Sequence, residues 1–169
     1  MNNKIRIVSR CLKWSVIGLS LLAIGYILIA YVVQGTFNFN SDSPLFIALW
    51  EHQQVNKSLL ILISLPALLL WSLIVFWSYR LFSYFELEEY FSDRSVRCYI
   101  WLVWIQVALF AQNIIVELAL GYYHSHFFED TAMSISLDLR RFFSLLLMIS
   151  IVHILKVARQ VELENKEFV

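Results

Sequence analysis

The chain has little of what a soluble domain usually contains. Only 15% of its 169 residues are charged, and it has 4 glycines, 2 prolines and 2 cysteines. This share of charge argues against an ordinary soluble fold, in which about a quarter of the residues are charged. Two cysteines, Cys11 and Cys98, do not make a disulfide framework or a cysteine metal site. With 60% hydrophobic residues and a mean hydropathy of +0.68, the chain is suited to a membrane.

Motifs of common catalytic sites are also missing. The sequence contains no G-x-S-x-G motif, no Walker lysine motif and no H-E-x-x-H motif. The segment HSHFFED offers histidines and carboxylates to a divalent metal, but a His-x-His without cysteines is more typical of a polar loop. We therefore expect no enzyme activity, no cofactor and no metal site.

Long runs without charge are present instead. A helix of about 20 apolar residues crosses the roughly 30 Å hydrocarbon core of a bilayer. The runs at 14–33, 59–77 and 98–116 reach this length, and the run at 142–155 reaches it if its helix begins near residue 137. We predict an all-α, four-transmembrane-helix bundle that forms a single domain over residues 1–169. Its expected spans are residues 14–33, 59–80, 98–121 and 137–157.

Positive charge is distributed unevenly over the predicted connections. Ten Lys and Arg residues precede the first charge-free run, lie between the second and third runs, or follow the fourth run, against three elsewhere. Basic connections favour the cytoplasmic side of a membrane. We expect a multi-pass protein of the bacterial inner membrane with both termini in the cytoplasm. The first span is expected to be retained, because its apolar run is longer than that of a usual signal peptide.

The third predicted span carries a stripe of polar residues. At about 100° per residue, Gln106, Asn113, Glu117 and His124 share one face of the helix, whereas Gln112 points away from it. A charge that faces lipid at the bilayer centre costs at least ~2.5 kcal/mol. The stripe is therefore expected to face the interior of the bundle or a second protomer.

Two hypotheses explain the carboxylate in this stripe. In the first, Glu117 pairs with Arg140 or Arg141 at the outer end of the fourth span, and the stripe is structural. In the second, Glu117 and His124 belong to a proton or cation path in a small oligomeric channel or transporter component. The first is favoured, because only one span is polar and transporters usually show paired repeats or broken helices.

Two connections have local signals of their own. The segment PLFIALWEHQQV, residues 44–55, is predicted to form a short helix lying on the surface. In the inner connection, Ser92 or Asp93 is expected to cap the third span's helix, with Phe91 placed to pack on Val96. Pro66 is a candidate kink in the second span.

Two short segments resemble a known family. The connection EYFSDRSVRCYIWLVWIQ and the terminus LKVARQVELENKEFV are similar to those of a bacterial four-helix inner-membrane family catalogued only as a domain of unknown function. In that family a Phe-Ser pair begins the third helix, as Phe91 and Ser92 do here. The C-terminal motif is matched through Ala158, Glu164, Asn165 and Val169.

This chain departs from the family at one point, and the resemblance implies a role in regulation. The family often has a glycine shortly before the Phe-Ser pair, where this chain has Glu88, Glu89 and Tyr90. Members of such families are often encoded beside a small helix-turn-helix regulator, which implies signalling or regulation.

Both family-like segments are expected on the cytoplasmic side. They are candidates for docking a cytoplasmic or membrane protein partner, or for packing on each other as a cover of the bundle. The candidate docking residues are Phe91, Ser92, Arg94, Glu164, Asn165 and Val169. We expect an accessory or regulatory subunit that contacts the lipid bilayer and a partner or a second copy of itself. No direct contact with nucleic acid is expected.

Overall fold

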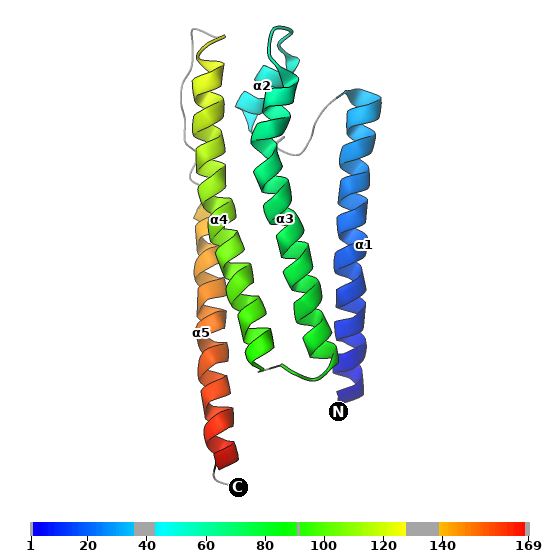
Figure 1. Ribbon diagram of the computed structural model, residues 1–169, viewed down its shortest axis with the longest axis vertical. Coiled ribbons are helices and arrows are strands. Elements are labelled where there is room, and N and C mark those ends of the chain that lie inside the picture. Colours follow the sequence, from blue (N-terminus) through cyan, green and yellow to red (C-terminus); the bar gives the residue numbers. More distant parts are fainter. Residues whose placement is uncertain (1, 36–42, 91, 128–138, 168–169) are drawn as a thin grey trace. The chain divides into compact units, whose positions relative to one another are not determined.

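The computed structural model of the protein describes residues 2–35, 43–90, 92–127 and 139–167. Within these ranges the side chains of residues 2–5, 34, 139–141, 162–163 and 165–167 are not described. The described residues form five α-helices, labelled in Figure 1. In chain order they are α1 (Asn2–Gln34), α2 (Pro44–Glu51), α3 (Lys57–Glu86), α4 (Asp93–His124) and α5 (Leu139–Glu167). The all-helical prediction is confirmed.

Four of these helices are long and apolar enough to cross a membrane, as predicted. The candidate spans are Arg6–Val33, Lys57–Glu86, Asp93–His124 and Phe142–Val161. The first three helices extend beyond the predicted spans at both ends, because a Lys, Arg or Glu ends an apolar run without ending a helix. The helix of α5 continues into the predicted tail as far as Glu167. The predicted start of the fourth span at residue 137 lies outside the described residues.

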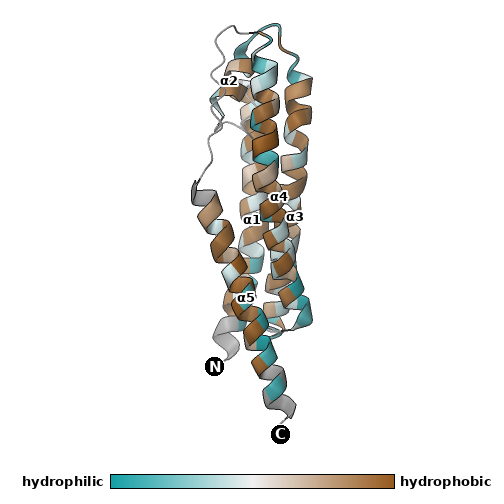
Figure 2. Cartoon of the chain, turned by 90° about the vertical axis from the view of Figure 1, so that its left-hand side faces the viewer, coloured by the Kyte–Doolittle hydropathy of each residue, from teal (hydrophilic) through white to brown (hydrophobic). Residues whose placement is uncertain are grey.

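The apolar side chains of these helices lie mostly on the surface. In the most apolar stretch of α1, α3 and α4 only 11% of the residues are buried, and in that of α5 none is. Figure 2 shows apolar residues, in brown, along most of each long helix. Such a surface is unfavourable in water and is the normal lipid-facing surface of a membrane protein. The distribution supports a membrane protein.

The chain divides into two compact units, and several helices contribute to both. Unit 1 contains both ends of the chain and the α3–α4 connection; unit 2 contains α2. Of the 13 Lys and Arg residues, only Lys57 falls in unit 2, so the positive charge is concentrated in unit 1. The bounds are Met1–Leu19, Ser72–Val107 and Asp138–Val169 for unit 1, and Ser20–Trp71 and Ala108–Leu137 for unit 2.

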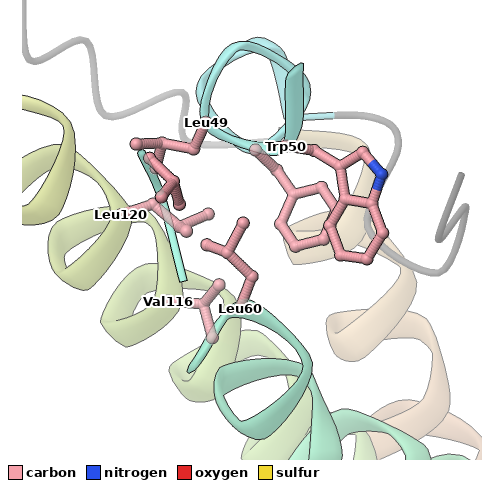
Figure 3. Packing of buried hydrophobic residues seen from close by; sticks show 7 residues of the cluster. Leu49, Trp50, Leu60, Val116 and Leu120 are labelled. Carbon is pink, nitrogen blue, oxygen red and sulfur yellow. The ribbon is translucent and has the colours of Figure 1, made fainter. Parts of the chain in front are cut away.

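Helix α2 supplies much of the core of unit 2. Pro44 starts this helix, at a position where its missing N–H group is not needed. Figure 3 shows side chains of α2 packed against α3 and α4. The buried cluster consists of Phe46, Leu49, Trp50, Val55, Leu60, Val116 and Leu120. The predicted short helix is confirmed over Pro44–Glu51. Its apolar face is covered by two neighbouring helices, whereas Ile47 and Glu51 stay exposed.

The end of α1 is tied to α2 within unit 2. Gly35 follows the last turn of α1 with a φ of 65°, in the left-handed region that glycine adopts without steric cost. Its N–H donates to the Tyr31 carbonyl oxygen at 3.1 Å. The indole N–H of Trp50 donates to the Gly35 carbonyl oxygen at 2.9 Å. A glycine cap and a buried tryptophan thus fix where the chain leaves α1.

Unit 1 has a smaller core between α3 and α4. Its buried residues are Leu81, Cys98 and Leu102, and Met148 of α5 packs against them. Beside this core the rings of Trp77 and Trp101 are stacked, with centroids 5.6 Å apart and planes at 9°. Helix α3 is continuous through Pro66.

The turn between α3 and α4 is closed by hydrogen bonds at both ends. The Glu89 N–H donates to the Tyr84 carbonyl oxygen at 3.0 Å, and Glu88 has a φ of 64°. The Ser95 N–H donates to the Ser92 hydroxyl oxygen at 3.2 Å, which confirms Ser92 as a cap of α4. The predicted packing of Phe91 lies outside the described residues. Glu88 thus has the backbone conformation for which glycine is the usual residue.

Glu88→Gly is expected to stabilise the protein. The left-handed conformation costs a residue with a side chain about 1–2 kcal/mol, and the greater freedom of glycine in the unfolded chain offsets part of this gain. The net effect should be about 0.5–1 kcal/mol. Thermal unfolding of the purified protein in detergent measures it. Glu88→Ala is the control, because it removes the same side chain and keeps the strain. Equal stability of the two variants would contradict the expectation.

Candidate functional site

The first charged group of unit 1 joins α1 to α3. Glu86, the last residue of α3, accepts from Arg10 at 2.8 Å and from the Lys13 ammonium at 2.6 Å. The side chains of Lys13 and Glu86 are only 15% and 18% exposed, and the ammonium also lies 5.5 Å from the centre of the Tyr79 ring. Poor access to water strengthens such a pair relative to a surface ion pair. The end of α3 is therefore held against α1 by charge.

The second charged group joins α4 to α5. Both nitrogens of the Arg159 guanidinium fork pair with both carboxylate oxygens of Asp93. A bidentate pair of this kind fixes geometry as well as supplying attraction. Asp93 also lies in the first turn of α4, where a negative charge is favoured by the helix dipole. The start of α4 and the end of α5 are thus linked through one carboxylate.

The predicted docking residues are only partly described. Ser92 is half-buried and serves as the cap of α4, while Arg94 is exposed. Glu164 is exposed on α5 and accepts from the Gln160 side-chain amide at 3.1 Å. Phe91, Val169 and the side chain of Asn165 lie outside the described residues. In unit 1, Arg94 and Glu164 are the two candidates whose charged groups are available to another molecule.

The predicted polar stripe follows one edge of the buried face of α4. Gln106, in unit 1, and Asn113 and Glu117, in unit 2, are half-buried, and His124 is buried. On a regular helix this line lies about 70° from the centre of the buried apolar face. That face is formed by Cys98, Leu102, Ile105, Val116 and Leu120. The stripe therefore flanks the helix contacts of α4.

The proposed partners of Glu117 are not described in full. Glu117 takes part in an interaction within the chain, so it is not an isolated carboxylate. Arg140 and Arg141 belong to unit 1 and their side chains lie outside the description. Pairing of Glu117 with either arginine stays a prediction.

Gln112 is not among the predicted site residues, but its side-chain amide is buried in the structure. Its side-chain oxygen and nitrogen are both buried and have no hydrogen-bond partner among the described residues. A signal was available, because Gln112 follows Ile105 by seven residues and precedes Val116 by four. At that spacing it lies close to the face on which these two buried residues lie. The amide therefore lies on the packed side of α4, where burial without a hydrogen bond lowers the stability of the fold.

The described part of the chain offers no support for a metal site. Within those ranges there is no group of three or more His, Cys, Asp or Glu side chains placed to hold a metal ion. Glu129 and Asp130 of the HSHFFED segment lie outside them.

Comparison with known protein families, with curated proteins and with solved structures finds no match to this chain. The resemblance to the four-helix inner-membrane family therefore stays a prediction based on its two short segments.

Gln112→Leu is expected to stabilise the protein by about 1 kcal/mol, because it replaces a buried amide without partners by an apolar side chain of similar size. Thermal unfolding in detergent measures the effect. Gln112→Glu is the opposing control and should lower the melting temperature, since it buries a charge at the same place. A Gln112→Leu variant that unfolds more easily than the parent would show that the amide has a partner.

Proposed function

We propose that the protein is a non-enzymatic, multi-pass protein of the bacterial inner membrane, with both termini in the cytoplasm. It acts there as an accessory or regulatory subunit through contacts at the cytoplasmic end. The observation that carries the proposal is that both chain ends and the α3–α4 connection, with the ten Lys and Arg residues at or next to them, belong to unit 1. Positively charged connections are retained on the cytoplasmic side during insertion, which supports this orientation.

The subunit role is supported by how the charges of unit 1 are arranged. Glu86 and Asp93 are used within the chain, where they fix helix ends against α1 and α5. Arg94 and Glu164 remain exposed on helices that these pairs hold in place. Charges of both signs on a fixed framework favour a specific protein contact, because their pattern selects a complementary partner. The absence of catalytic motifs in the sequence agrees with this role.

The orientation is testable with the native cysteines. Cys11 is exposed and Cys98 is buried, so a maleimide that does not cross membranes reports on Cys11. We expect labelling only after bacterial spheroplasts are lysed. Gln53, exposed after α2, provides the matched site: Gln53→Cys in a Cys11→Ser background should be labelled in intact spheroplasts. The reverse pattern, with Cys11 labelled before lysis, would overturn the proposed orientation.

The subunit role is testable by shortening the tail. Removal of residues 162–169 should leave expression and membrane insertion unchanged but abolish the stoichiometric co-purification of a partner, measured by mass spectrometry after gentle solubilisation. Arg94→Glu should weaken the same association, whereas Glu51→Gln, an exposed change in unit 2, should not.

Two results would count against the subunit role. Purification of the full-length protein without any stoichiometric partner would contradict the subunit role directly. A truncated chain that fails only in expression would instead show that the tail serves packing.

A further inference from the structure

A cleft lies between the start of α4 and the end of α5, within unit 1. Its volume is about 330 Å³. Two turns of each helix line it: Asp93, Val96, Arg97 and Ile100 from α4, and Lys156, Arg159 and Gln160 from α5. These residues fall at the first turns of the candidate span Asp93–His124 and at the last turns of the span Phe142–Val161. In the proposed membrane placement, the cleft lies where a spanning helix meets the headgroup layer.

The charge of this cleft is positive. Three of its residues are basic and one is acidic. The carboxylate of Asp93 is occupied by the Arg159 fork, and Arg97 directs only its Nε atom to the Asp93 carbonyl oxygen, at 3.3 Å. Arg97 and Lys156 are exposed and neither pairs with a carboxylate among the described residues. Two cations from different helices therefore face the cleft with their charge uncompensated.

We propose that this cleft binds the phosphate headgroup of an anionic phospholipid. Arg97 and Lys156 meet the phosphate, while the Asp93–Arg159 pair holds the two helices at the spacing that forms the cleft. Basic pockets between helices at a cytoplasmic membrane surface have this chemistry. The inference rests on the proposed placement of the charged end of unit 1 at a membrane surface.

The surface next to the cleft favours a lipid over free phosphate. Val96 and Ile100 give the cleft an apolar wall. Trp101 and Trp104 are exposed and follow Arg97 by four and seven residues, so the three side chains share one face of α4. On α5, Ile149 is exposed and precedes Lys156 by seven residues, so these two side chains share one face of that helix. A phosphate held at the cleft would thus lie at the head of an apolar surface along which acyl chains can pack.

The test compares lipids on the purified full-length protein. Native mass spectrometry or a thermal-shift titration in detergent measures the affinity for phosphatidylglycerol, for zwitterionic phosphatidylcholine and for inorganic phosphate. We expect preferential, saturable binding of phosphatidylglycerol. Replacing both exposed cations, Arg97→Gln with Lys156→Gln, should weaken it roughly tenfold or more. Arg94→Gln removes an exposed arginine of the same turn that does not line the cleft, and it should leave the affinity unchanged.

Four results would overturn the inference. The double variant could bind phosphatidylglycerol as tightly as Arg94→Gln does, or the parent protein could bind both lipids equally. Inorganic phosphate could displace the lipid at similar concentrations, which would assign the cleft to a free anion. The double variant could lose a co-purifying protein while keeping lipid affinity, which would assign it to an acidic segment of a partner.

Thermal unfolding without lipid verifies that these variants are folded, and both substituted side chains are exposed. Failure of the lipid test is distinct from failure of the proposed function. Cys11 labelling reports the side of the membrane and tail removal reports the partner, and neither depends on which molecule occupies the cleft.

Discussion

The structure depends on a hydrocarbon solvent around its helices. Five helices with so few buried residues would not be stable in water, because the apolar surface left exposed along α1 and α5 would have to be hydrated. In a bilayer the same surface has no cost, and the backbone groups are satisfied inside each helix. The small buried clusters then need only to position the helices, and do not have to drive folding.

Under that condition polar contacts become important for helix association. Between apolar helices in lipid, packing and polar contacts replace the hydrophobic effect. The described contacts fit this view: ion pairs link α1 to α3 and α4 to α5 in unit 1, while α2 brings Trp50 to the end of α1 in unit 2. In unit 1, ion pairs hold the helix ends. In unit 2, the short helix α2 packs its apolar face on its neighbours and holds the end of α1 through Trp50.

Much of the fold could be predicted from the sequence, because charge-free runs of membrane length depend on composition alone. The capping role of Ser92 was also predictable, since it depends on neighbouring residues. Tertiary context decided the rest. The burial of α2 depends on α3 and α4 offering a matching surface, and the pairing of Lys13 with Glu86 joins residues far apart in the chain. The burial of Gln112 depends on which side of α4 meets its neighbours.

The attachment of α5 differs in kind from that of α4. No residue in the most apolar stretch of α5 is buried, and its ion pair to α4 uses side chains that are 29% and 61% exposed. Dissolved salt weakens an exposed pair far more than it weakens apolar packing. Beside the packing of Met148 on the core of unit 1, the last helix is therefore held by a contact whose strength depends on ionic strength, whereas the apolar contact of α3 with α4 is much less sensitive to salt.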